Sequence, residues 1–284
     1  VALTLGAAEL VLRVALGARY YTSIQLDPQL LYRPSPGSRR EYTRAAINGG
    51  VRVRYAMNSQ GFRGDELSAS GESLRVVVYG DSFIMAEFSR TEDTFAERLE
   101  AYLEQALGER VEVVNAGVAG YGPDQELRRM EAELGSLRPD LVIAAIYAGN
   151  DFGDILRNKL YRLGDDGGLL ENRFSFDPAI ERRVAVSRSE LILKKVLRDT
   201  LGRISGAAGA GVPTGREARI ERVERSLEQL VREHHEYVVK GDDVVHELLS
   251  DPYNADVSLT PESDSARYRI ALMEQIIVRM RAAT

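Results

Sequence analysis

Three apolar runs separated by helical periodicity set the expected fold. Leu74–Gly80, Val111–Asn115 and Leu141–Tyr147 are short and rich in valine, isoleucine and alanine. Continuous runs of this length are typical of strands buried on both faces of a parallel sheet. Between them, apolar side chains recur every three or four residues, which predicts one helix over 92–107 and a second that begins at Pro123 and is closed by Pro139-Asp140. This alternation indicates an α/β fold, a parallel sheet with helices on both faces.

Each predicted helix carries one apolar face that we expect to pack on the sheet. These faces comprise Phe95, Leu99, Tyr102 and Leu103 on the first helix, and Leu127, Met130, Leu134 and Leu137 on the second. Gly108 is expected to end the first helix, and Pro123 stands at the favoured first position of the second.

The first seventy residues do not follow the strand–helix rhythm. Residues 1–17 are nearly all apolar, but they are too short and too charged to span a bilayer, which takes ~20 apolar residues. We interpret them as the end of a membrane anchor whose beginning is missing, in preference to an amphipathic surface helix. Residues 26–42 carry three prolines and predict an extended connector with little regular structure, and alternation within 46–58 predicts a short hairpin. The turn Asn58–Gly64 either rims a cleft or, as we prefer, docks the connector on the domain.

After residue 151 the rhythm breaks, and no strand is predicted. We expect a helical insertion over about 152–260, which could cover the sheet edge as a lid. Its parts are a turn at 164–168, helices over 189–204 and 216–239, and a flexible linker at 206–215. A last helix is predicted over 262–281. The expected organisation is a membrane-anchor remnant or amphipathic helix (1–22), a connector with a hairpin (23–70) and an α/β domain (71–284).

Composition narrows the classes of function. The 284 residues are 44% hydrophobic and 28% charged, which is ordinary globular material. The net charge of −6, with no basic cluster, argues against a nucleic-acid partner. The absence of cysteine excludes disulfides and thiolate chemistry, and no histidine or carboxylate set has convincing metal-ligand spacing. No glycine-rich phosphate-binding motif occurs either, so we expect neither a metal nor a cofactor.

Each predicted strand ends in a polar, glycine-rich turn. The turns are Gly80-Asp81-Ser82, Asn115–Gly120 and Gly149-Asn150-Asp151. In a parallel sheet all three lie along one edge, where α/β proteins place reactive groups. Ser82 could act as a nucleophile, with oxyanion donors in its own N–H, the N–H of a glycine on the second turn and the Asn150 amide, each worth roughly 3 kcal/mol. The bland alternative is that Asp-Ser is merely a helix cap after a strand.

With these three blocks in order, the chain resembles the SGNH (GDSL-type) hydrolases over Leu74–Asp151. The resemblance implies a three-layer α/β/α flavodoxin-like domain and the activity of an esterase, lipase or carbohydrate deacetylase. It implies Ser82 as nucleophile and Gly120 and Asn150 as oxyanion-hole residues, with Gly117 as an adjacent turn residue. More loosely, residues 8–64 look like bacterial envelope members that carry an N-terminal membrane segment.

The chain departs from the family in its fourth block, an Asp-x-x-His that supplies the general base. Its three histidines are His234, His235 and His246. The first two fall on a predicted helix, where surface or core histidines are common. His246 stands in an Asp243-Val-Val-His246 sequence, but its flanks predict a short helix and turn. We expect the chain to be truncated at both ends, with the true base beyond Thr284.

The leading hypothesis is therefore a serine esterase or deacylase of the cell envelope, anchored in the membrane with its catalytic domain outside the cytoplasm. Its partner would be an O-acylated glycan or a lipid-like ester, with a membrane contact through the N-terminus and no assigned oligomeric state. A polysaccharide O-acyltransferase would use the same groups, with a sugar hydroxyl replacing water. A non-catalytic module that binds glycan or protein is the alternative from another class.

Overall fold

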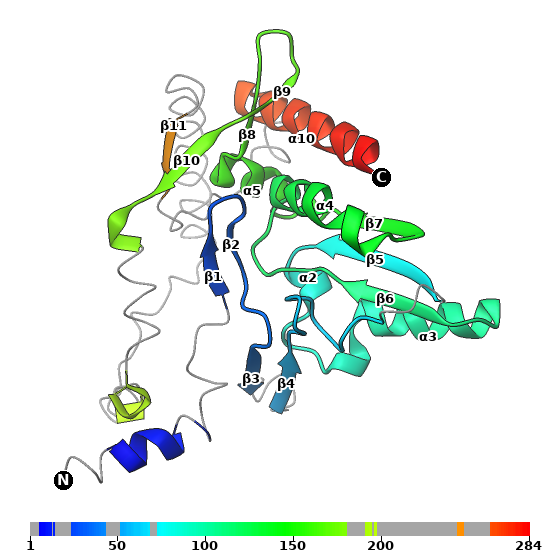
Figure 1. Ribbon diagram of the computed structural model, residues 1–284. Coiled ribbons are helices and arrows are strands. Elements are labelled where there is room, and N and C mark those ends of the chain that lie inside the picture. Colours follow the sequence, from blue (N-terminus) through cyan, green and yellow to red (C-terminus); the bar gives the residue numbers. More distant parts are fainter. Residues whose placement is uncertain are drawn as a thin grey trace, which may run out of the picture.

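A three-stranded parallel sheet lies at the centre of the fold (Figure 1). The computed structural model describes residues 6–12, 14, 24–43, 52–68, 73–180, 191–194, 196–197, 243–246 and 262–284. Strand β5 (Leu74–Gly80) lies between β6 (Val111–Asn115) and β7 (Leu141–Ala145). Val78 pairs with Asn115 and Gly80 with Ala145, so the three strands end at one edge. The predicted mixed α/β class with a parallel sheet is confirmed.

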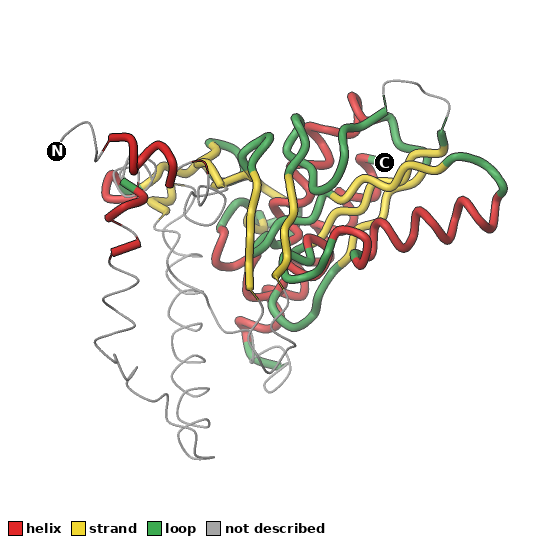
Figure 2. The backbone as a smooth tube through the Cα atoms, turned by 90° about the horizontal axis from the view of Figure 1, so that it is seen from below, coloured by secondary structure: helices red, strands yellow, loops and turns green. Residues whose placement is uncertain are grey.

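Helices lie on both faces of this sheet (Figure 2). Successive side chains of β5 point to opposite sides and enter two separate cores. On one face, Val76 and Val78 pack with residues of α3 (Phe95–Leu107). On the other, Val77 and Tyr79 join a larger core with α4 (Pro123–Leu137), α5 (Asp151–Asn158) and α10 (Asp264–Ala283). The predicted final helix is thus confirmed as α10, and it packs on α4 and α5.

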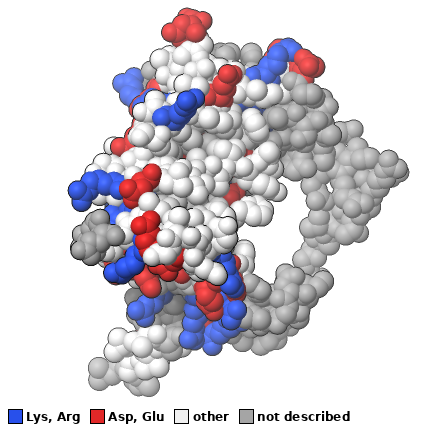
Figure 3. Space-filling view, turned by 90° about the vertical axis from the view of Figure 1, so that its right-hand side faces the viewer, with Lys and Arg blue, Asp and Glu red and all other residues white. Residues whose placement is uncertain are grey.

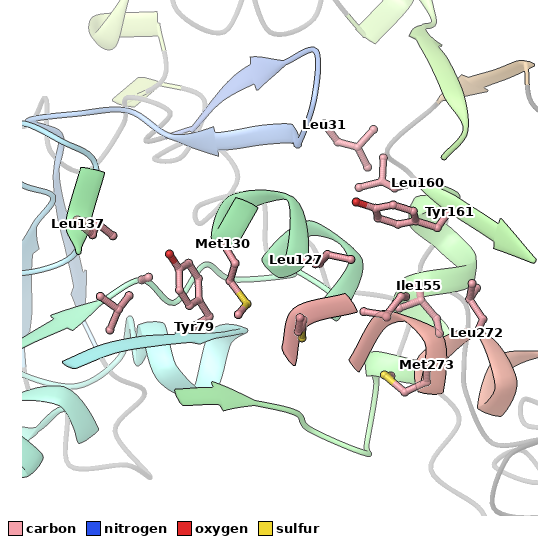
Figure 4. Packing of buried hydrophobic residues seen from close by; sticks show 14 of the residues in the cluster. Leu31, Tyr79, Leu127, Met130, Leu137, Ile155, Leu160, Tyr161, Leu272 and Met273 are labelled. Atoms are coloured by element: carbon pink, nitrogen blue, oxygen red, sulfur yellow. The ribbon is translucent and has the colours of Figure 1, made fainter. Parts of the chain in front are cut away.

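The larger core is built from side chains that are far apart in the sequence (Figure 4). Leu127 and Met130 of α4 lie under the sheet, as their helical spacing predicts. Leu272 and Met273 of α10 extend the same cluster toward Ile155 of α5. The cluster therefore fixes α5, which follows the third turn, relative to the strands.

The apolar face predicted for α3 is partly wrong. Leu99 and Leu103 pack against the core, but Phe95 is 47% exposed and Tyr102 is 68% exposed. The buried face centres on Ala96, Leu99 and Leu103, and at 100° per residue the two aromatic residues stand at its border. Gly108 ends the helix with φ +70°, as expected. The helix starts later than predicted, after a 3-10 turn, η2 (Thr91–Asp93).

The third strand was predicted as a buried strand over Leu141–Tyr147, which is also wrong in part. Strand β7 ends at Ala145, and Leu141 is half exposed. Among the described residues β7 pairs with β5 alone, so it forms an edge of the described sheet. A valine- and alanine-rich run does not distinguish a central strand from an edge strand.

The N-terminal connector is more regular than expected. Antiparallel pairs form between β1 (Ile24–Asp27) and β2 (Leu31–Pro34), and between β3 (Arg39–Thr43) and β4 (Arg52–Ala56). The carboxylate of Asp27 closes the first hairpin by accepting hydrogen bonds from the N–H groups of Gln29 and Leu30 at 2.8 and 2.9 Å. In β4, Val53 and Tyr55 are buried, as their alternation predicts, but the partner strand β3 begins at residue 39, before the range predicted for the hairpin.

Strands also occur after residue 151, where none was predicted. Strands β8 (Tyr161–Leu163) and β9 (Leu169–Glu171) form a hairpin around the predicted turn, and β10 (Arg173–Phe176) pairs with β11 (Asp243–His246). Strands of three or four residues are too short to leave a periodic signal. Part of the helix predicted over 189–204 is described and helical, whereas 206–215 and 216–239 lie outside the described residues.

Charged side chains of both signs are mixed on the face shown in Figure 3, with uncharged surface between them. Residues 6–12 are helical. Within the described part of the chain, no helix combines the length and the apolar character that crossing a bilayer requires.

The core position of Leu127 leads to a stability prediction. Leu127→Ala should lower the free energy of unfolding by about 3 kcal/mol, because it leaves a cavity between α4 and the sheet. Leu107→Ala, at the half-exposed end of α3, is the matched control and should cost less than about 1 kcal/mol. Urea unfolding followed by circular dichroism measures both. Equal losses would contradict this assignment of the core.

Candidate active site

The first turn holds Ser82 at the surface, where only its carbonyl is hydrogen-bonded within the described residues. Ser82 begins the short helix α2 (Ser82–Met85), and the N-cap is the buried Asp81, whose carboxylate accepts a hydrogen bond from the Phe83 N–H at 2.8 Å. The exposed Ser82 hydroxyl and the Ser82 N–H have no hydrogen-bond partner among the described residues. Capping is therefore the role of Asp81, and it does not account for Ser82.

The second turn runs alongside the end of β5. The N–H of Ala116 donates to the Val78 carbonyl at 2.9 Å, and the N–H of Val118 donates to the Gly80 carbonyl at 3.0 Å. Gly120 then adopts φ +79°, a conformation that favours glycine. Within the described part of the chain, no hydrogen bond engages the Gly120 N–H. This turn therefore places a free backbone donor beyond the end of the strand.

Helix α2 packs directly on the second turn because Gly117 has no side chain. A Cβ atom at Gly117 would collide with the backbone N of Met85. The Asn115 side chain joins the two segments, since its Nδ2 donates to the Ile84 carbonyl at 2.9 Å and its Oδ1 accepts from the Gly117 N–H at 3.1 Å. The guanidinium of Arg63 donates to the carbonyl of Met85. Both contacts hold the C-terminal end of α2.

The turn Asn58–Gly64 docks the connector, as we preferred. Phe62 is buried in the main core, and the Arg63 N–H donates to the Asn115 carbonyl at 3.2 Å. The Arg63 guanidinium also donates to the Ser89 carbonyl at 2.8 Å, beyond α2. Through Arg63, the turn thus holds the segment that follows Ser82.

The third turn is joined to the second by a chain of hydrogen bonds. The Asn150 Nδ2 donates to Asp154 at 2.6 Å, and Asp154 forms a 2.8 Å ion pair with Arg157. Arg157 in turn donates to the Gly120 carbonyl at 2.6 Å. An amide nitrogen carries two hydrogens, so Asn150 keeps a second N–H for a further acceptor. The network fixes the Asn150 amide and the Gly120 backbone relative to one another.

The structure therefore brings the turns of Ser82, Gly120 and Asn150 together at one edge of the sheet. The first and second share backbone hydrogen bonds, and Arg157 joins the second to the third. The first and third meet where the rings of Phe83 and Tyr147 pack with centroids 4.4 Å apart. The site combines an exposed hydroxyl with N–H donors from three turns.

No histidine in the described part of the chain accompanies this site. His246 lies in β11, beside β10 and away from α2 (Figure 1), and His234 and His235 fall outside the described residues. The short helix and turn predicted around His246 are wrong for 243–246, where two adjacent valines pair as a strand with β10.

Several supporting residues had no clear signal in the sequence. Asn150, Asp154 and Arg157 are spaced by four and three residues. If a helix had been predicted from residue 151, this spacing would have placed the three side chains on one helix face. Arg63 reaches α2 across more than twenty residues of sequence, and no local pattern predicts such a contact.

Buried acidic side chains lie behind the three turns. Burial, reinforced by the charges of Asp81, Asp154 and Asp124, raises the pKa of Asp151 to about 8. Burial raises the pKa of Asp124 to about 7, and that of Glu126 well above its ordinary value. No group of these side chains in the described residues is arranged to hold a metal ion.

Comparisons with known proteins add a weak structural likeness. No protein-family model matches the chain, and no curated protein matches it. Among solved structures, AlinE4, an SGNH-hydrolase family esterase, is similar at 19% identity and a TM-score of 0.26, over 76% of this chain and 98% of AlinE4. TesA is similar at 16% identity and a TM-score of 0.25, over 74% of this chain and 99% of TesA.

The packing at Gly117 leads to a matched pair of variants. Gly117→Ala should destabilise the protein by more than about 2 kcal/mol, because its Cβ would displace the backbone of α2. Gly135→Ala is the control, since it meets nothing within 4 Å in α4 and should stabilise by about 0.5–1 kcal/mol. Thermal and urea unfolding measure both signs. A neutral Gly117→Ala would show that α2 does not need this close approach.

The raised pKa of Asp151 predicts a pH dependence of stability. Between its unfolded value of 3.8 and about 8, the folded state holds a proton that the unfolded state has lost. The free energy of unfolding should therefore fall as pH rises from 5 to 8, by at most about 1.4 kcal/mol per pH unit for one such group.

Asp151→Asn should flatten this fall, because the amide oxygen can still accept the Tyr147 N–H without carrying a charge. Glu109→Gln, on the exposed surface, is the control and should leave the fall unchanged. Urea midpoints at several pH values provide the measurement. An unchanged slope in Asp151→Asn would contradict the assignment.

Proposed function

We propose that this chain carries the nucleophile and the oxyanion hole of a serine esterase or deacylase of the SGNH type. The observation that supports the proposal is that hydrogen bonds link the turns of Ser82, Gly120 and Asn150 at one edge of the sheet. There the Ser82 hydroxyl is exposed, and the N–H groups of Ser82 and Gly120 have no partner among the described residues, while the Asn150 amide keeps one N–H beside its bond to Asp154. A helix cap or a binding surface does not require a hydroxyl and several available N–H groups on neighbouring turns. Acyl transfer through a serine requires both.

The proposed reaction begins when Ser82 Oγ attacks the carbonyl carbon of an acyl ester. The carbonyl oxygen becomes an oxyanion and accepts hydrogen bonds from the N–H groups of Ser82 and Gly120 and from the Asn150 amide. The alcohol leaves, an acyl-enzyme forms on Ser82, and water then releases the acid. Ser82 must also pass its proton to a base, a role for which no histidine of the described residues is placed.

Orientation of the Asn150 amide is the part of this proposal that the surrounding side chains support most directly. A free amide could rotate, but its bond to Asp154 fixes one N–H and thereby aims the other. Asp154 is buried and is itself held by Arg157. Because Arg157 also binds the Gly120 carbonyl, two of the three donors share one support.

The substrate and the membrane contact expected from the sequence are also proposed here. We propose an acyl ester of the cell envelope, an O-acylated glycan or a lipid-like ester, as the substrate, with a membrane contact through the N-terminal segment. These proposals rest on the resemblance of residues 8–64 and 74–151 described above.

Labelling by a fluorophosphonate tests the proposed nucleophile. Ser82 should be phosphonylated, with added imidazole accelerating the reaction as an external base, and mass spectrometry should locate the label. Ser82→Ala should abolish the label, and Asn150→Ala should slow it about a hundredfold through the loss of one oxyanion donor. Ser89→Ala is the control and should react like the parent protein.

Failure to label Ser82, with or without imidazole, would contradict the esterase proposal. It would favour a non-catalytic module that binds its ligand at the same edge. Labelling spread over several serines would also count against the proposal, since it would show no activation at Ser82.

A further inference from the structure

An exposed aromatic pair lies beside the proposed nucleophile. Phe83 follows Ser82 directly, and Tyr147 precedes Asn150 by three residues. Their rings pack at 47° with centroids 4.4 Å apart, yet they remain 64% and 43% exposed. Such apolar surface at the mouth of a site, rimmed by polar turns, is typical of a surface that binds a ligand. We call Phe83 and Tyr147 the aromatic shelf.

The backbone under each ring is fixed by the side chain of a buried aspartate. The Phe83 N–H donates to Asp81 at 2.8 Å, and the Tyr147 N–H donates to Asp151 at 2.6 Å. Both aspartates are almost completely buried. The shelf is therefore preformed, and binding on it would require little ordering of the chain.

Gly149 shows how the shelf reaches the third turn. A Cβ atom at Gly149 would collide with the ring of Tyr147, so the ring lies directly against the Gly149 backbone. Gly149 immediately precedes Asn150. The shelf thus extends without interruption from the residue after the nucleophile to the residue before the proposed amide donor.

We propose that the aromatic shelf binds the apolar acyl chain of the ester that Ser82 attacks, an inference that rests on the proposed function. When the carbonyl carbon is at Ser82 Oγ and its oxygen faces the N–H donors, the acyl chain must leave the carbonyl across an adjacent surface. Phe83 and Tyr147 present exposed, uncharged rings next to Ser82 and to the third turn. An alkyl acyl chain gains contact with both rings, whereas the single methyl of an acetyl group gains little. The substrate class is therefore a medium-length alkyl ester.

A series of alkyl phosphonofluoridates with methyl, butyl and octyl chains tests this specificity. The second-order rate of Ser82 labelling should rise about twofold to fourfold per methylene over the first few carbons, as expected for apolar surface buried on a shelf. The rates are followed by intact-protein mass spectrometry in the presence of imidazole. Equal rates for all three probes would overturn the shelf and leave the role of Ser82 standing.

Variants of the shelf should change the ratio of octyl to methyl rates. Phe83→Ala and Tyr147→Ala should lower this ratio at least fivefold, and Tyr147→Phe should retain it because the ring carries the contact. Tyr102→Ala removes an equally exposed ring from α3 and is the control. Circular dichroism confirms that each variant is folded. Unchanged ratios in both alanine variants would also overturn the proposal.

A second measurement does not depend on the reactivity of Ser82. The chain contains no tryptophan, so Phe83→Trp introduces a single fluorophore into the shelf. Titration with 2-decanone should shift its emission to the blue in a saturable way, whereas acetone should not. A Tyr147→Ala change in the same protein should weaken the response. If no phosphonate labels Ser82, the proposed function fails, and this titration alone decides whether the shelf binds alkyl chains.

Discussion

Close packing of α2 against the second turn is the constraint on which the whole site depends. A helix of four residues has no stability of its own, so its position is set by what it contacts. Gly80 and Gly117 allow these contacts, because a side chain at either would collide with α2. Asn115 and Arg63 then hold the carbonyl groups at its far end. The position of the exposed Ser82 hydroxyl thus depends on the contacts that other residues make with α2.

The second and third turns depend on each other through Arg157. Its guanidinium binds the Gly120 carbonyl and the Asp154 carboxylate, and Asp154 binds the Asn150 amide. A planar group with several donors suits this task better than a lysine could, because one fixed fork serves two acceptors. One guanidinium therefore supports both the Asn150 amide, through Asp154, and the Gly120 backbone.

The central strands, the order of elements and the three turns could be predicted from the sequence, because valine runs and glycine-rich strand ends are local signals. The hairpin of β1 and β2 escaped prediction because prolines in this stretch suggest an irregular connector, while the Asp27 turn that closes it leaves no periodic trace. Strands β8–β11 were missed because each spans at most four residues.

Residues of the site divide in the same way. Ser82, Gly120 and Asn150 stand in recognisable turns, so their positions could be predicted. Arg63 and Arg157 act over long separations in sequence, through side chains whose reach depends on how the elements pack. Such contacts follow only from the three-dimensional arrangement. The sequence therefore predicts the groups that would contact a ligand. It does not predict the side chains that orient those groups.

Electrostatics explains why that support matters. A negative charge developing at Ser82 would lie near buried acidic side chains, and burial raises the pKa of Asp151 to about 8 and that of Asp124 to about 7. Near neutrality Asp151 is therefore mostly uncharged and opposes an oxyanion less. Arg157 is already paired with Asp154, so its charge is largely compensated. Stabilisation of the oxyanion must then come from N–H dipoles, which act only at short range. The glycine-dependent packing that orients these N–H groups therefore matters more for the proposed reaction than the net charge of the site.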